Sequence, residues 1–182
     1  GNTALNCAAL RGHLTVVEQL LDENADVETP DLVTGKTALL KATYGGHQEV
    51  VEELLLYGAD PNVADNAGYT PLAFAACSGS REVLSALLRH GAQPDPQDTF
   101  GVTPLMQAAT RGNADLVGVL LQAGAQVLVA DADGRTAVDY AEAGDFWDLL
   151  AQMQSHAGEA GGGGGLGDGG GGGGDGNGNG NS

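Results

Sequence analysis

The chain is poor in basic residues, in cysteine and in long apolar runs. Its 182 residues include 7 Lys and Arg against 24 Asp and Glu, which gives a formal net charge of −17. A chain so negative repels phosphate backbones and anionic lipid headgroups, so we expect neither nucleic acid nor a membrane surface as a partner. A neutral or basic protein partner is expected instead. No apolar run approaches the roughly 18 residues that a membrane-spanning helix needs.

The two cysteines, Cys7 and Cys77, are too few for a disulfide framework or a Cys-rich zinc site. Their number suits a reducing compartment, and we therefore expect an intracellular protein of the cytoplasm. No charged and then apolar leader segment opens the sequence, which also begins without Met. We expect this chain to be a fragment of a longer one.

Glycine is abundant, with 31 residues, and it dominates the last part of the chain, residues 158–182. A Gly-rich segment cannot recover the entropy lost on ordering, so this part is predicted to be a disordered tail. The spacing Gly-x-Gly-x-x-Gly occurs there, but no predicted strand precedes it and no helix follows, which excludes a phosphate-binding loop. Residues 1–157 are then the folded domain.

The folded domain is built from a repeated pattern. A Thr followed by Ala or Pro and an aliphatic residue recurs every 33 or 34 residues, at Thr3, Thr37, Thr70, Thr103 and Thr136. An Asp-containing turn with a Gly precedes the Thr, which can cap a helix with its hydroxyl group, and Pro71 and Pro104 suit the first helical position. The pattern divides the domain into five repeats at about 1–30, 31–64, 65–97, 98–130 and 131–157.

Each repeat predicts two helices. The first is short and brings an aliphatic residue and an Ala onto one face. The second carries apolar residues at i, i+1, i+4 and i+5, as at Val50, Val51, Leu54 and Leu55. This helix should end in the left-handed conformation at Gly58, Gly91 and Gly124, and at Asn24 in the first repeat. The predicted fold class is all-α, a solenoid of five helix-turn-helix repeats with short β-turns.

The two terminal repeats differ from the others. The first begins inside its turn and carries Leu14, Val16 and Val17 as an interior repeat would, which suggests a longer array. The fifth is interpreted as lacking one residue near Gly144, with Asp148 in an apolar position. It ends in apolar residues at helical spacing, namely Phe146, Leu149, Leu150 and Met153. We expect the fifth repeat to be a C-terminal cap.

The pattern Gly-x-Thr-(Pro/Ala)-Leu-x-x-Ala, its period and the Gly-Ala-Asp-Pro-Asn segment at 58–62 resemble the ankyrin repeat family. The resemblance covers residues 1 to about 155. It implies a β-turn or hairpin and two antiparallel helices per repeat, and a non-catalytic protein-binding scaffold or adaptor. The His that follows Thr-Pro-Leu in this family is replaced in every repeat, by Asn6, Leu40, Ala73, Met106 and Asp139. We expect the hydrogen bond of that His to be missing.

The sequence shows no set of residues that would form a catalytic site. No nucleophile with a base, no paired carboxylates and no metal-ligand cluster emerge, so we predict no enzyme activity, no cofactor and no metal. His13 and His47 stand where second helices begin and are predicted to cap them. The alternative function is a regulatory or substrate-recruiting module of a larger enzyme or channel, whose active domain would lie upstream of Gly1.

The resemblance also implies where a partner binds, because turn tips and the adjacent face of the first helix carry the contacts in ankyrin-like proteins. The matching residues are Lys36, Tyr44, Asn66, Tyr69, Phe100, Val102, Arg111 and Arg135. Nothing in the fold requires an aromatic residue at Tyr69 or Phe100, and interfaces concentrate their energy in aromatic and Arg anchors. We predict that these two lie near each other along a concave, acidic surface of a monomer. Phe74 and Tyr140 are predicted to pack between repeats.

Overall fold

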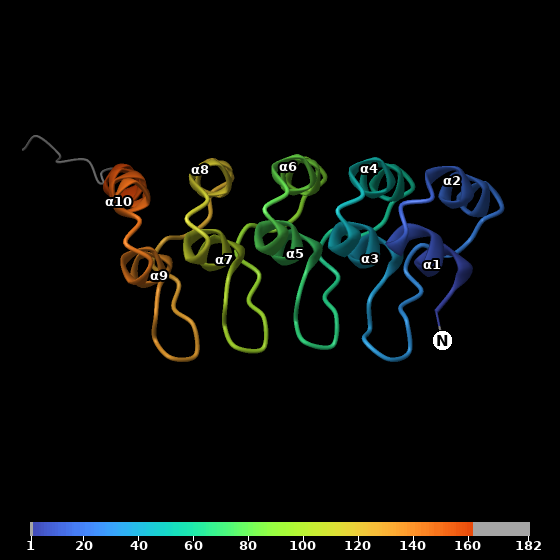
Figure 1. Cartoon of the computed structure of the whole chain (residues 1–182), viewed down its shortest axis with the longest axis horizontal. Helices are drawn as coiled ribbons and strands as arrows, with labels where there is room; N and C mark the ends of the chain where they lie inside the picture. Colours follow the sequence, from blue (N-terminus) through green and yellow to red (C-terminus); the bar gives the residue numbers. More distant parts are fainter. Residues whose placement is uncertain (1, 162–182) are drawn as a thin grey trace, which may run out of the picture.

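The computed structural model describes residues 2–161 and shows ten helices in them, arranged as five pairs (Figure 1). The first helices of the pairs are α1 (Ala4–Leu10), α3 (Ala38–Gly45), α5 (Pro71–Ser78), α7 (Pro104–Thr110) and α9 (Ala137–Ala143). The second helices are α2 (Leu14–Asp22), α4 (Gln48–Leu56), α6 (Arg81–Arg89), α8 (Ala114–Gln122) and α10 (Trp147–Gly161). The predicted all-α solenoid is confirmed.

The helices form two parallel rows, and four hairpin loops project from the side of the first-helix row that faces away from the second helices (Figure 1). Each first helix contacts the first helix of the next repeat, and the same holds for the second helices. The last helix continues to Gly161, beyond the expected domain end at residue 157. The rest of the predicted tail lies outside the described residues.

The repeated Thr caps the first helix in all five repeats. Its hydroxyl accepts a hydrogen bond from the backbone N–H three residues later, from 3.0 Å at Thr3 to 3.4 Å at Thr136. In two repeats the residue that replaces the family's His bonds back to the cap: Met106 Sδ accepts from Thr103 N, and Asp139 Oδ2 accepts from Thr136 N. These two side chains therefore supply a hydrogen bond to the cap at the position where the family has His.

The predicted capping role of His13 and His47 is wrong. Both residues stand at the N-cap position, but neither side chain makes a capping hydrogen bond. The His47 ring turns instead to the preceding repeat, where its Nε2 lies 3.0 Å from the Leu10 carbonyl oxygen. The shorter side chain of Asn113 reaches its own helix and accepts from Leu116 N at 3.1 Å. The ring of His47 thus joins neighbouring repeats rather than capping α4.

The second helices end as predicted, with Gly58, Gly91 and Gly124 in the left-handed region and Asn24 joining them at φ 62°. The interpretation of the fifth repeat as one residue shorter is wrong. Asp145 takes the left-handed place held by Gly112 in the repeat before, at φ 57°. Leu149, Leu150 and Met153 are consequently buried in register with the other second helices.

The second helices bury the predicted apolar stripe except at Leu88, which is half-buried, and in the first repeat. Val17 and Leu21 are buried there, whereas Val16 is 42% exposed and Leu20 half-buried. The equivalent of Val16 in the second repeat, Val50, is 1% exposed. Among the described helices, α2 contacts only one other second helix, α4, whereas α4 contacts both α2 and α6. Burial at this position therefore depends on the neighbouring repeat.

The close contact between the loops of successive repeats predicts a stability difference between two glycines. Both Gly112 and Gly124 have positive φ, but a Cβ on Gly112 would stand 2.5 Å from the Phe146 ring, while one on Gly124 would meet nothing within 4 Å. We expect Gly124→Ala to cost about 1 kcal/mol of unfolding free energy, for the backbone alone. Gly112→Ala should cost about 2–3 kcal/mol, since overpacking adds to it. Urea unfolding measures both, and equal costs would contradict the assigned contact.

Candidate functional site

Four buried aspartates organise the hairpins that project from the solenoid. The hairpins span residues 31–36, 65–69, 98–102 and 131–135, and each is closed by a backbone hydrogen bond from the N–H of its Asp to the carbonyl of its last residue. The Oδ1 atom of each Asp accepts two backbone N–H groups of its own hairpin, as Asp98 does from Phe100 and Val102, both at 2.9 Å. The carboxylates therefore fix the conformation of the turns.

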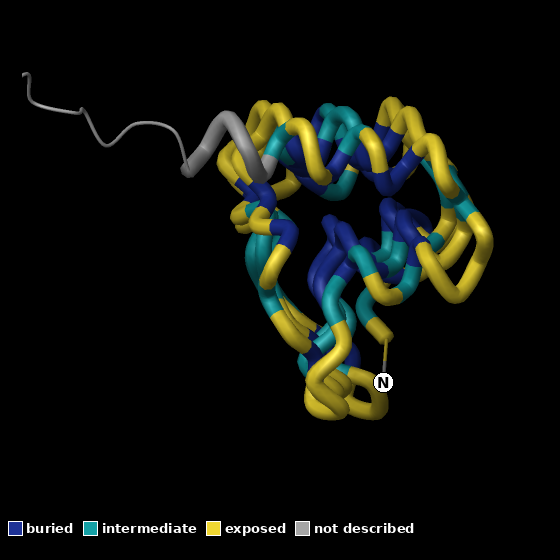
Figure 2. Tube along the Cα trace, turned by 90° about the vertical axis from the view of Figure 1, so that its left-hand side faces the viewer, coloured by how far each residue is buried: buried dark blue, intermediate teal, exposed yellow. Residues whose placement is uncertain are grey.

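Backbone hydrogen bonds also join the hairpins to one another. Asn66 N donates to the Thr34 carbonyl at 3.0 Å, and Ala132 N donates to the Phe100 carbonyl at 2.9 Å. Thr99 N forms the equivalent bond to Ala67 in between, at 3.2 Å. The hairpin tips consequently form one connected row, visible at the foot of Figure 1 and at the base of the tube in Figure 2. Side chains on the tips are held at fixed spacing.

Large apolar side chains stand exposed on this row. Leu32 and Val33 are each 82% exposed, and Phe100 is 67% exposed. Phe100 was predicted as a contact residue, but Leu32 and Val33 were missed. The available signal was the one-residue insertion that makes the first Thr spacing 34 rather than 33, because it lengthens this hairpin.

An aromatic cluster lies where hairpins and first helices meet, and we define it as Tyr44 on α3, Phe74 on α5 and Tyr69 at the end of the hairpin 65–69. The rings of Tyr44 and Phe74 meet edge to face at 5.7 Å, and those of Tyr69 and Phe74 lie 5.2 Å apart. The ammonium group of Lys36 stands 5.1 Å from the Phe74 centroid, a cation–π contact. The site residues Lys36, Tyr44 and Tyr69 are thus brought together around a ring that the sequence analysis assigned to packing.

Tyr69 turns towards Phe74 rather than along the row of tips. Burial and the charge of Asp98 raise the pKa of its phenol group. Phe100 stacks on no other aromatic ring in the part of the chain that the structure describes. The two predicted anchors therefore occupy different surroundings, one inside the aromatic cluster and one on the row of tips.

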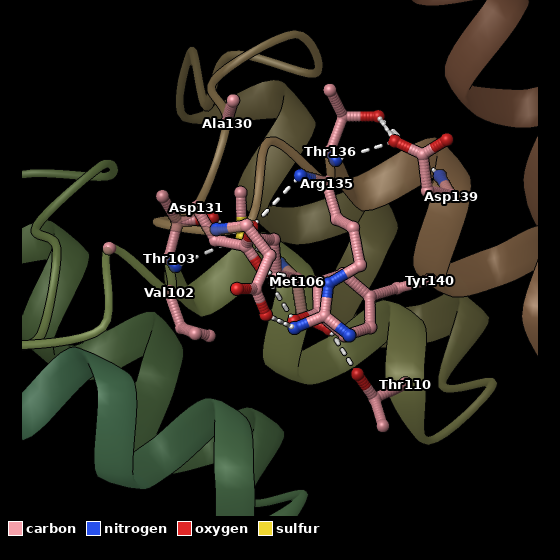
Figure 3. Close-up of polar contacts among 12 residues, drawn as sticks. Val102, Thr103, Met106, Thr110, Ala130, Asp131, Arg135, Thr136, Asp139 and Tyr140 are labelled. Atoms are coloured by element: carbon pink, nitrogen blue, oxygen red, sulfur yellow. Dashed lines mark hydrogen bonds and ion pairs between the residues drawn. The ribbon is translucent and has the colours of Figure 1, made fainter.

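Arg135 belongs to a polar network in the last hairpin (Figure 3). Its Nε lies 3.2 Å from Asp131 Oδ2, and a terminal nitrogen lies 2.7 Å from Asp133 Oδ2. The hydroxyl of Tyr140 donates to Asp131 Oδ2 at 2.6 Å, which lowers the pKa of the carboxyl and raises that of the phenol. Because Arg135 also stacks on the Tyr140 ring, at 5.0 Å, its side chain is already engaged within the protein.

The remaining predicted residues divide into structural and exposed ones. Asn66 donates from its side chain to the Val33 carbonyl at 3.3 Å, and the side chain of Val102 packs against the core, so both help to build the hairpins. Arg111 is exposed and donates to Cys77 Sγ at 3.3 Å. Within residues 2–161, no carboxylate lies within ion-pair distance of Arg111.

The repeated helix pairs and hairpins suggest membership of a known repeat family, and comparison with protein-family models tests this. A model described as ankyrin repeats (3 copies) matches residues 5–98, and one described as ankyrin repeats (many copies) matches residues 87–141. The chain belongs to the ankyrin repeat family. No curated protein matches it at a significant level. Ankyrin repeats are generally protein–protein interaction modules and are typically non-catalytic.

The charges of this ankyrin domain are divided between two faces. The hairpin face consists of the hairpins and the first helices, and the second-helix face consists of the second helices and the loops that follow them. Helices α1, α3, α5 and α7 carry no Asp or Glu, and the Asp residues of the first three hairpins are buried. Every other acidic residue of the first four repeats lies on the second-helix face.

The basic residues show the opposite distribution. Arg11, Lys36, Lys41, Arg111 and Arg135 lie on the hairpins or first helices or at the ends of those helices, and Arg81 and Arg89 lie on α6. The hairpin face thus holds five of the seven basic residues, together with the four buried hairpin Asp residues and three exposed acidic residues of the last repeat, Asp133, Asp139 and Glu142.

Metal-ligand groups and membrane-spanning helices were looked for in the part of the ankyrin domain that the structure describes. No group of three or more His, Cys, Asp or Glu side chains is placed to hold a metal ion among residues 2–161. In the same residues no helix combines the length and the apolar character needed to cross a bilayer.

Proposed function

We propose that this ankyrin domain is a non-catalytic scaffold or adaptor that holds a protein partner on its hairpin face. The observation that carries the proposal is the exposure of Tyr44, which is 64% exposed while it contacts Phe74. Large exposed apolar side chains occur on both faces, but among those in the described residues only Tyr44 is packed in an aromatic cluster, and such ordered, exposed side chains are typical of protein interaction sites. Leu32, Val33 and Phe100 extend this exposed surface along the row of tips.

The rigidity of the face supports the same proposal. Buried carboxylates fix each hairpin, and backbone hydrogen bonds join successive tips. A surface that is ordered before binding loses little conformational entropy on association. The free cysteines Cys7 and Cys77 support an intracellular location, and we propose that the chain acts as a monomer.

The proposal predicts that the two sequence-predicted anchors are needed for binding. A protein partner captured by the domain would be used to measure binding. Its affinity for the double variant Tyr69→Ala, Phe100→Ala would be compared with its affinity for the native chain. We expect binding to weaken by at least about tenfold, because aromatic anchors dominate interface energy. The control is Tyr57→Ala, which removes a 44% exposed ring that follows α4 on the second-helix face.

Capture that survives the double change and is lost with Tyr57→Ala would move the site to the second-helix face. Loss of the Glu52 and Glu53 carboxylates on α4 would test that outcome independently. Circular dichroism and melting curves of each variant would show that the fold is intact, so that a change in capture reports on the surface alone.

A further inference from the structure

Arg111 is an exposed cation of the hairpin face that, like Arg11, forms no ion pair within residues 2–161. Lys36 and Lys41 pair with Asp65 and Asp31 at 2.8 and 3.0 Å, and Arg135 is held by its own hairpin. Arg111 is exposed, and its hydrogen-bond partner in the structure is the thiol of Cys77. A thiol is a weak acceptor, while a guanidinium group carries five N–H donors in a fork that matches a carboxylate.

The guanidinium group lies next to the aromatic cluster. Cys77 follows Phe74 by three residues on α5, and residues at this spacing share one face of a helix. The contact of Arg111 with Cys77 therefore places its charge one helical turn along from the Phe74 ring. A segment lying across α3, α5 and α7 would meet aromatic rings first and then an unpaired guanidinium group.

The surrounding charges favour an acidic segment over a basic one at this place. The first helices of the first four repeats contribute no Asp or Glu, so an incoming carboxylate meets no exposed like charge on them. The acidic residues of α4, α6 and α8 belong to the other helix row, and packed helices are separated by about 8–10 Å. At an ionic strength of about 0.15 M, the Debye length of about 8 Å screens much of their repulsion.

We propose that the hairpin face takes a partner segment that combines apolar anchors with carboxylate side chains, and that Arg111 binds a carboxylate of that segment. This inference rests on the proposed function. It replaces the expectation of a basic partner at this face, because that expectation came from the net charge of the whole chain. Basic ligands would be drawn to the acidic second-helix face instead.

The test uses three pools of short random peptides, each containing Tyr, Leu and Gly in equal parts with Glu, Gln or Lys as the fourth residue. Backbone amide shifts in NMR spectra locate binding, because amides near Tyr44, Cys77 and Arg111 report on the hairpin face, while those near Glu53 and Asp115 report on the second-helix face. At about 0.15 M salt, we expect the Glu pool to shift the hairpin-face amides at the lowest concentration.

The variants Arg111→Gln and Arg81→Gln are matched, because each removes one exposed positive charge and neither residue has an ion-pair partner within the described residues. Arg111→Gln should weaken the Glu pool by about tenfold, the loss expected for one charge-assisted hydrogen-bonded contact. Arg81→Gln, on α6, should leave it unchanged. Binding of the Glu pool should also strengthen from about 0.01 M to about 0.15 M salt, as the longer-range repulsion is screened.

Three other outcomes separate this inference from the proposed function. Equal binding of the Glu and Gln pools at the hairpin face, unaffected by Arg111→Gln, would leave a binding face for apolar segments and overturn the assignment of a carboxylate. Strongest binding of the Lys pool at that face would also overturn it. If no pool shifts the hairpin-face amides, both the inference and the proposed function fail.

Discussion

Replacing Asp31 by Ala should lower the unfolding free energy by about 3–5 kcal/mol, the cost of leaving one member of a buried ion pair without its partner. The side chains of Asp31 and Lys41 are 5% and 9% exposed, with 3.0 Å between their charged atoms. Asp31 also accepts from the backbone N–H and the hydroxyl of Thr34, both at 2.6 Å, so the change removes the hydrogen bonds that hold the hairpin. Urea unfolding measures the loss.

The control is Asp133→Ala, which removes a carboxylate that is also ion-paired but exposed. The Asp133 side chain is 72% exposed and pairs with Arg135 at 2.7 Å. Exposed pairs contribute little, so we expect a change of less than about 1 kcal/mol. Similar losses for both variants would show that the buried pair contributes no more than a surface one.

The buried hairpin carboxylates of Asp31 and Asp131 should make the stability of the domain sensitive to acid. Hydrogen bonds from Thr34 hold the pKa of Asp31 well below its ordinary value, and the Tyr140 hydroxyl lowers that of Asp131. A carboxyl whose pKa is lowered by folding stabilises the protein above its unfolded pKa of about 3.9, and this stability is lost as the pH falls through and below that value. Asp95 opposes the trend, because burial raises its pKa. Unfolding free energy should therefore fall between about pH 5 and pH 2, and less steeply in Asp31→Asn.

The sequence predicted the architecture because repetition makes each position visible several times. The left-handed residues that end the second helices at Gly58 and Gly91 could be inferred because glycine adopts positive φ easily. The same conformation at Asn24 could be inferred because Asn tolerates it too. The helix that includes Leu149 and Leu150 was assigned the wrong register, because Asp145 in a glycine position was interpreted as a deletion. A left-handed Asp is uncommon, and pattern alone does not distinguish it from a missing residue.

The site was predicted only in outline, because the sequence gives positions and not the direction of side chains. Lys36 and Tyr44 were predicted as contact residues, but their meeting at Phe74 depends on how two successive repeats stack. Arg135 was predicted as a contact residue too, and its engagement with Asp131 and Tyr140 depends on the shape of one hairpin. Net charge did not show that most basic residues lie on the hairpin face, where four of the Asp residues are buried in the turns.

Phe74 should matter more for binding than any residue predicted from the sequence, because it is the ring that Tyr44, Tyr69 and Lys36 all contact. We expect Phe74→Ala to weaken capture of the partner by at least about thirtyfold, as for a central anchor of an interface. Because the ring is half-buried, the same change should cost about 2 kcal/mol of stability, less than a fully buried Phe.

The variant Phe74→Leu separates the two effects. Leu keeps most of the apolar volume, so the stability loss should stay below about 1.5 kcal/mol. It removes the aromatic faces that organise Tyr44, Tyr69 and Lys36, so binding should still fall by about fivefold. Phe146→Leu is the matched control, since Phe146 is also half-buried but packs on Gly112 in the loop between α7 and α8. The unfolding free energy of the Phe146→Leu variant should fall, and its binding of the partner should be unchanged. Equal binding by both Leu variants would mean that the aromatic cluster stabilises the stack of repeats and takes no part in recognition.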